Sequence, residues 1–195
     1  MPRLKATILR IIFLLILTLC VSSCNKNKPI ESSIANDVFN KNDKEQIEAF
    51  FLIATANASN AIISKSQIAQ QKSSQNKILE LSRQIESHQN HLLQEVSKVA
   101  GKKLVIITDI GTTNKLALYE LIDTNDTEFD KAYINSLAKS IDEQIEVFES
   151  ISKETNDTTI LKLVLEYLPT EYQILRETQR IKQEINLNAE KSIIN

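Results

Sequence analysis

The chain has 195 residues, of which 42% are hydrophobic and 25% charged, and its formal net charge is −2. This composition is ordinary for a folded protein, and the length allows one domain to bury a core without disulfides or structural metals. The slightly acidic balance argues against a protein that binds nucleic acid or anionic membranes in general.

The first two dozen residues have the pattern of a targeting segment. Three basic residues, Arg3, Lys5 and Arg10, precede an apolar run without charge over residues 11–21. A run of this length is too short to span a bilayer comfortably and is typical of the h-region of a signal peptide.

Directly after this run stand Val21, Ser22, Ser23 and Cys24. Small residues before a cysteine in this place resemble the cleavage box of bacterial lipoproteins. The resemblance implies that residues 1–23 are a lipoprotein signal peptide and that lipid is attached to Cys24. The alternative is an ordinary secretory signal in which the cysteine is incidental. Cys20 fits the box less well, because a leucine precedes it.

Lipid attachment at Cys24 has consequences for the rest of the chain. Cleavage removes three basic residues and no acidic ones, so the net charge falls to −5. Cys20 is lost with the leader, so no disulfide can form within one mature chain. The predicted partner is the membrane, through the lipidated cysteine, and no nucleic acid. Because Asn25 rather than aspartate follows, the resemblance to bacterial lipoproteins implies an outer membrane protein on the periplasmic side. Residues 24–42 are polar and predict a flexible tether.

The distribution of glycine and proline indicates an all-α domain over residues 43–190. Neither residue occurs from 30 to 100 or from 112 to 168, so the tight turns that β-hairpins require are missing. Apolar residues recur at alternating spacings of three and four instead. Helices are predicted over residues 43–72, 75–101, 112–123, 127–155 and 157–190.

Local signals refine the ends of these helices. Ser73 and Ser74 are expected to break the chain and cap the second helix, and Gly101 is expected to end it. Asp157 should cap the last helix, which Pro169 should kink or divide. The inner face of the first helix is expected to include Ile47, Phe51, Ala54, Ala58, Ala61 and Ile68. The run LVIITDI after the second helix predicts an extended connection over the end of the bundle, because no partner strand is present.

Four long helices with a long middle connection and a short extra helix suggest a ferritin-like four-helix bundle. Sequence details resemble the bacterial envelope family called domain of unknown function 4142, roughly from Lys44 to Leu187. These details are FDKAY at 129–133, Phe148-Glu149, Leu168-Pro169, IAQQK at 68–72 and the segment 85–88. The resemblance implies a helical bundle in the envelope and no established reaction.

The chain departs from this family at the positions where a metal site is expected. The family tends to carry a glutamate on the first helix and histidines on the later long helices. Ser64, Ile141 and Ile174 stand at these positions, and only His88 is kept. A di-metal bundle also needs Glu-x-x-His motifs, and none occurs. We therefore predict aliphatic neighbours for His88.

His88 interrupts the apolar face of the second helix and allows two interpretations. It can be a neutral histidine hydrogen-bonded across helices or exposed at the edge, which we prefer. Alternatively, His88 and His91 could hold one divalent ion at the surface, although two imidazoles make a weak site. No other metal ligand, cofactor or catalytic residue is predicted, because phosphate loops, nucleophile elbows and free cysteines are missing.

Thr158, within Asp157-Thr158-Thr159, resembles an O-glycosylation acceptor of some bacterial envelopes. The competing interpretation is that this segment is only the start of a helix, which we favour.

Two functions follow from these patterns. The first is a lipid-anchored envelope protein whose bundle is a non-catalytic binding or structural domain, with a stress-related role as a further expectation. The second is a degenerate ferritin-like protein that handles metal or peroxide. The protein partner of the first is unknown, and a homo-oligomer is compatible with both.

Overall fold

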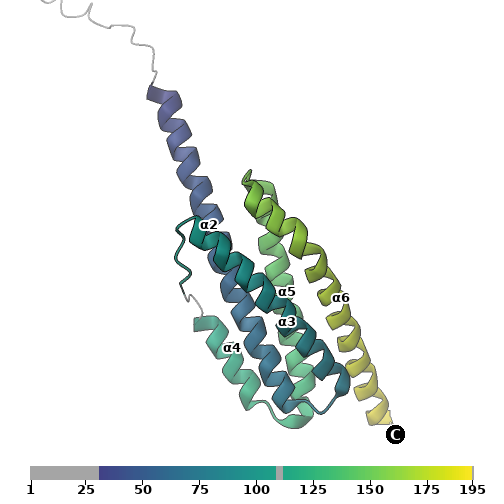
Figure 1. The fold of residues 1–195 in the computed structure, drawn as a ribbon. Helices are drawn as coiled ribbons and strands as arrows, with labels where there is room; N and C mark the ends of the chain where they lie inside the picture. The colour runs from purple at the N-terminus through teal and green to yellow at the C-terminus, as the bar shows by residue number, and fades with distance from the viewer. Residues whose placement is uncertain (1–30, 109–111, 195) are drawn as a thin grey trace, which may run out of the picture. The chain divides into compact units, whose positions relative to one another are not determined.

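The computed structural model describes residues 31–108 and 112–194 (Figure 1). Side chains are described for residues 43–108, 116–126 and 128–187. The predicted signal peptide and the lipid attachment site at Cys24 lie outside the described residues.

The described chain is all-α, as the sequence predicts. Its helices are α2 (Glu31–Lys72), α3 (Asn76–Lys102), α4 (Thr112–Asp123), α5 (Asp126–Glu154) and α6 (Thr158–Ile194). No strand occurs in residues 31–108 or 112–194.

The chain divides into two compact units, and the boundary between them lies within α2. The second unit holds the core. The first is Met1–Asn40, whose described residues belong to α2, and the second is Lys41–Asn195. In the second unit α2 and α3 run antiparallel, as do α5 and α6 (Figure 1). The long connection that contains α4 joins the pairs, so that α3 and α5 run in the same direction. Among the described side chains, all buried hydrophobic residues lie between Phe51 and Ile181, so the core belongs to this unit.

The apolar faces predicted for α3 and α5 are confirmed. All six seam residues of α3 are buried, as are all six of α5. They are Ile78, Leu81, Ile85, Leu92, Val96 and Val99 in α3, and Ile134, Leu137, Ile141, Ile145, Phe148 and Ile151 in α5. Along α6, Ile160, Val164, Tyr167 and Ile181 are buried, whereas Ile174 and Ile185 are partly buried.

The face predicted for α2 is wrong in part. Ile47 is 37% exposed, while Leu52, Thr55, Ser59 and Ser66 are buried. α2 buries residues around much of its circumference, so its alanines and serines do not mark a single face. A stretch of α2, Asp43–Lys72, is also long and apolar enough to cross a membrane, but half of its most apolar window is buried in the bundle. Such burial is expected of a core helix.

Two of the long helices, α2 and α6, extend further without a break than the sequence predicts. α2 begins at Glu31, so residues 31–42 of the predicted tether are helical. No proline or glycine follows Pro29 until Gly101, so nothing in the sequence prevents this extension. Pro169 does not divide α6, which is continuous through it.

The end of α3 also differs from the prediction. Gly101 is helical, and the left-handed residue is Leu104, with φ of 57°. The Leu104 amide donates to the Gly101 carbonyl and the Val105 amide to the Ala100 carbonyl, which is the hydrogen-bond pattern of a Schellman motif. At the start of α3, the predicted break is present, but Gln75 rather than a serine holds the N-cap position.

The described part of the connection after α3 contains no strand, which agrees with the predicted extended connection. Residues 105–108 have no regular structure. Val105 and Ile107 pack against the core, whereas Leu104 and Ile106 point into solvent. The segment is fastened by Asn57, whose Nδ2 donates to the Thr108 carbonyl at 2.8 Å.

Candidate functional site

The core consists of two apolar clusters with a polar layer between them. The first cluster includes Ile62, Ile85, Ile141 and Leu175, and the second includes Phe51, Leu92, Phe148 and Val164. Between them, each long helix contributes one buried polar residue: Ser59 from α2, Gln89 from α3, Gln144 from α5 and Glu171 from α6. We call these four residues the polar layer.

Side-chain hydrogen bonds join the polar layer across all four helices. Gln144 Nε2 donates to Ser59 Oγ at 3.1 Å. Gln89 Nε2 donates to Gln144 Oε1 and to Glu171 Oε1, both at 2.9 Å. Burying amides and a carboxylate is costly unless they are paired, so this network fixes how the helices face one another.

His88 lies at the edge of the polar layer. Its Nε2 is 2.9 Å from Glu171 Oε1, and its side chain is 17% exposed. The imidazole also lies beside the ring of Tyr167, with centroids 5.7 Å apart. A pocket of about 280 Å³ between α3 and α6 reaches His88 from outside, past Ile85, Thr170 and Ile174. His88 is therefore the member of this group nearest to solvent.

Glu171 is the most constrained group in the layer. Its side chain is fully buried, and Oε1 accepts hydrogen bonds from both Gln89 and His88. Its other oxygen, Oε2, has no hydrogen-bond partner. A buried carboxyl group with one orphaned oxygen depends strongly on the donors that remain.

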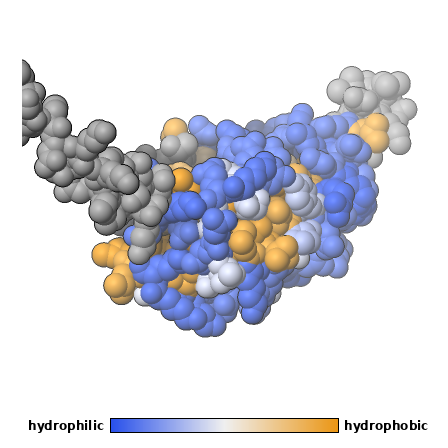
Figure 2. Space-filling view, turned by 90° about the horizontal axis from the view of Figure 1, so that it is seen from above, coloured by the Kyte–Doolittle hydropathy of each residue, from blue (hydrophilic) through white to orange (hydrophobic). Residues whose placement is uncertain are grey.

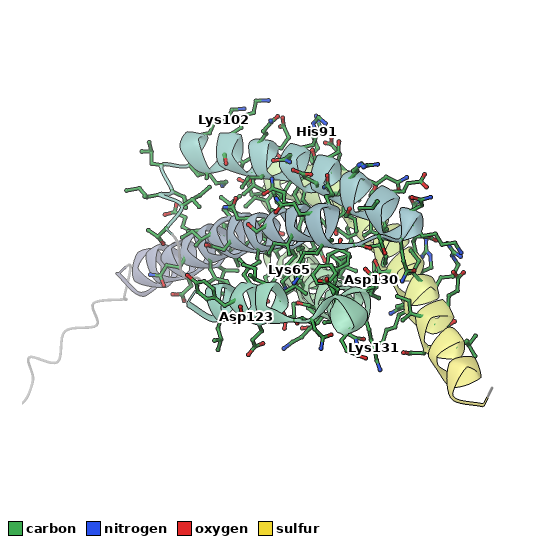
Figure 3. All side chains as sticks on the ribbon, turned by 90° about the horizontal axis from the view of Figure 1, so that it is seen from below. Lys65, His91, Lys102, Asp123, Asp130 and Lys131 are labelled. Carbon is green, nitrogen blue, oxygen red and sulfur yellow. The ribbon has the colours of Figure 1, made fainter. Side chains whose placement is uncertain are left out.

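The preferred interpretation of His88 as a histidine hydrogen-bonded across helices is thus confirmed. The prediction of aliphatic neighbours is wrong in part. Leu81, Ile85 and Ile174 line the pocket at His88, but Glu171 bonds to His88 and Gln89 bonds to the same oxygen of Glu171. His91 is exposed on the outer face of α3, as Figure 3 shows, whereas His88 faces Glu171.

The positions at which the family resemblance places metal ligands do not gather donors. Ile141 is fully buried in the first apolar cluster, and Ile174 packs against the same cluster. Ser64 is half-buried and donates to the carbonyl of Asn60 in its own helix. Among the described side chains, no group of three or more His, Cys, Asp or Glu residues is placed to share a metal ion.

The donors around His88 do not fit the metal centre of a ferritin-like bundle. Such a centre needs glutamates from two helices and Glu-x-x-His from two others. The polar layer offers one histidine, one carboxylate and neutral amides, which already bond to one another. The donors of this layer therefore do not support such a metal centre.

A charged cluster ties the other end of the bundle together. Lys103 Nζ donates to Glu48 Oε2 at 2.8 Å and to Asp157 Oδ2 at 2.7 Å. Thr155 Oγ1 donates to Glu48 Oε1 at 2.6 Å. Burial is the largest single effect and disfavours charge on both Lys103 and Asp157. The hydrogen bond between them, together with Glu48 for Lys103 and the Ile160 amide for Asp157, outweighs burial. The pKa of Lys103 is therefore raised and that of Asp157 lowered.

Asp157 also caps α6, as predicted. Its Oδ1 accepts from the amides of Thr159 and Ile160 at 2.9 and 3.0 Å. Thr158 is the first residue of α6 and is exposed. Its glycosylation stays a prediction.

Lys65 is an unusual buried cation in α2, and Figure 3 shows it among the helices. Its Nζ donates to Ser140 Oγ at 2.7 Å, and burial, chiefly, lowers its pKa despite the attraction of Glu143. Near it, the FDKAY residues Phe129 and Tyr133 are fully buried, with rings stacked at 6.2 Å. Burial raises the pKa of Tyr133, whose hydroxyl lies 3.4 Å from Ser66 Oγ. This motif therefore serves the core.

The fold and the polar layer define an all-α helical bundle domain. The profile of the family described as "Domain of unknown function (DUF4142)" matches residues 38–181. The chain belongs to this family, and the resemblance seen in the sequence is confirmed. No curated protein and no solved structure gave a match.

Proposed function

We propose that the protein is a lipid-anchored envelope protein whose helical bundle is a non-catalytic binding or structural domain. The observation that carries this proposal is the polar layer, in which each polar side chain bonds to the next helix. Catalytic groups need access to a substrate, and Ser59, Gln89, Gln144 and Glu171 are all buried. A layer of this kind specifies helix register, which is a structural role.

Lipid anchoring rests on the sequence from Val21 to Cys24. The small residues, the preceding apolar run and the basic start agree with one another. A lipid-held domain of net negative charge stays at the membrane through its acyl chains rather than through attraction to anionic headgroups. The outer membrane and the periplasmic side remain part of this proposal, as does a stress-related role.

Labelling with radioactive palmitate in a bacterial host tests the anchor. We expect label in the wild-type chain and in Cys20→Ala, but none in Cys24→Ala, which should also leave the membrane fraction. Cys20→Ala is the matched control, because it removes the other cysteine near the predicted cleavage site. An unlabelled wild type, or equal label in Cys24→Ala, contradicts the anchor.

A further inference from the structure

An open cleft lies between the α2 residues 43–51 and the α5 residues 146–154. Its volume is about 730 Å³. Apolar side chains form most of its surface, namely Ile47, Phe50, Phe51, Val147 and Ile151. The cleft is distinct from the polar layer and from the pocket at His88, because it shares no residue with either.

Part of this apolar surface faces solvent. Phe50 is 63% exposed and Ile47 is 37% exposed. The face drawn in Figure 2 is largely hydrophilic, with hydrophobic side chains gathered in limited areas. Large apolar side chains left uncovered around a concave site are typical of a ligand-binding position.

The charged groups of the cleft all have one sign. Asp43, Glu146 and Glu154 line it, and no basic side chain does so among the described residues. Ser150 Oγ donates to Glu154 Oε1 at 2.6 Å and so orients this carboxylate. Three carboxylates beside an apolar surface complement a ligand that is apolar in its body and positive at one end.

The walls of the cleft are held in place by contacts behind it. Phe51 packs edge-to-face against Phe148, with ring centroids 5.2 Å apart. Thr155, directly after α5, donates to Glu48 of α2 at 2.6 Å. A cleft with fixed walls loses little conformational entropy when a ligand binds.

We propose that this cleft binds a small cationic amphiphile, with its apolar body against Phe50 and Val147 and its positive group at the carboxylates. The volume matches one small molecule and not a peptide helix, whose interface is several times larger. The inference rests on the proposed role as a binding domain, but it does not depend on lipid attachment.

Titration calorimetry of residues 25–195, which contain the complete core, tests the inference without the lipid. The probes are dodecyltrimethylammonium, neutral dodecyl maltoside and anionic dodecyl phosphate, each below its micelle concentration. We expect one equivalent of the cationic probe to bind, about tenfold more tightly than the neutral one, with an affinity that falls as salt rises. The anionic probe should bind most weakly.

Two variants locate the binding site. Glu146→Gln with Glu154→Gln should weaken the cationic probe about fivefold and leave the neutral one unchanged. Ser150→Trp should fill the cleft and weaken both probes. Glu143→Gln removes an exposed carboxylate elsewhere on α5 and should leave the affinities for both probes unchanged. Circular dichroism confirms that each variant is folded.

No binding, equal affinity for the cationic and neutral probes, or full binding to Ser150→Trp overturns the inference. Loss of palmitate label is a separate result, which contradicts the anchor and leaves this binding site standing.

Discussion

His88 Nε2 lies 2.9 Å from Glu171 Oε1, and this contact links the solvent-facing edge of α3 to a fully buried carboxyl group of α6. Of the two Glu171 oxygens, only Oε1 is hydrogen-bonded. The histidine therefore supplies one of the two side-chain donors on which the buried group depends.

Removing this donor should destabilise the bundle. We expect His88→Ala to lower the free energy of unfolding by about 2 kcal/mol, because Glu171 is left with Gln89 alone. His91→Ala, on the exposed side of the same helix, should change it by less than about 0.5 kcal/mol. Urea unfolding followed by circular dichroism measures both, and equal effects would show that the contact does not stabilise the fold.

Coupling within this pair gives a second prediction. Glu171→Gln should cost less than His88→Ala, because it keeps the shape of the side chain and an oxygen that can accept hydrogen bonds. The double variant should cost less than the sum of the two, because His88 matters chiefly through Glu171. Strict additivity in the same urea assay would argue that the two residues act independently.

The Lys103–Asp157 pair predicts how stability depends on pH. The folded pKa of Asp157 lies below its ordinary value, so its contribution is present above pH of about 4 and is lost as pH falls through the folded pKa. The folded pKa of Lys103 is raised, so this residue affects stability at alkaline pH. Its contribution is present below pH of about 10 and is lost as pH rises through the folded value.

Lys103→Met should therefore flatten the acid limb of the stability profile between pH of about 5 and 2. Lys98→Met is a matched control, because Lys98 pairs with Glu95 at an exposed position of the same helix. Thermal melts across this range measure both variants. An acid limb that is unchanged in Lys103→Met would contradict the role of the charged cluster.

A substitution at the left-handed Leu104 should stabilise the protein, whereas the substitutions above destabilise it. Its side chain is 90% exposed and its φ is 57°, a conformation that costs a leucine more than a glycine. Leu104→Gly should raise the free energy of unfolding by about 1 kcal/mol. Ile106→Gly is the control, because Ile106 is also highly exposed, at 80%, and has no positive φ. Stabilisation in both variants, or in neither, would contradict the account of this helix end.

The helix seams could be predicted from the sequence, and the polar layer could have been found by the same spacing. In α3, both His88 and Gln89 lie at helical spacing between Ile85 and Leu92, three and four residues after Ile85. In α6, Glu171 falls between Tyr167 and Ile174 at the same spacing. A pattern of hydrophobic residues alone does not predict these buried polar residues, because they interrupt the pattern.

Other features could not be predicted because they depend on neighbouring helices. The buried face of α2 has no single direction in its sequence, since Ser59, Ser66 and several alanines are small enough to be buried on any side. The cleft beside Phe50 exists only because residues 43–51 of α2 lie beside the end of α5. The left-handed Leu104 replaces the glycine that local rules predict, because Gly101 lies within the helix.

The central proposal is that His88 serves Glu171 and not a metal ion. Its most direct test is the metal content of residues 25–195 after equilibration with iron, manganese or zinc and removal of free metal, with His88→Ala alongside. The account predicts no stoichiometric ion in either protein. One ion per chain in the wild type, lost in His88→Ala, would contradict it.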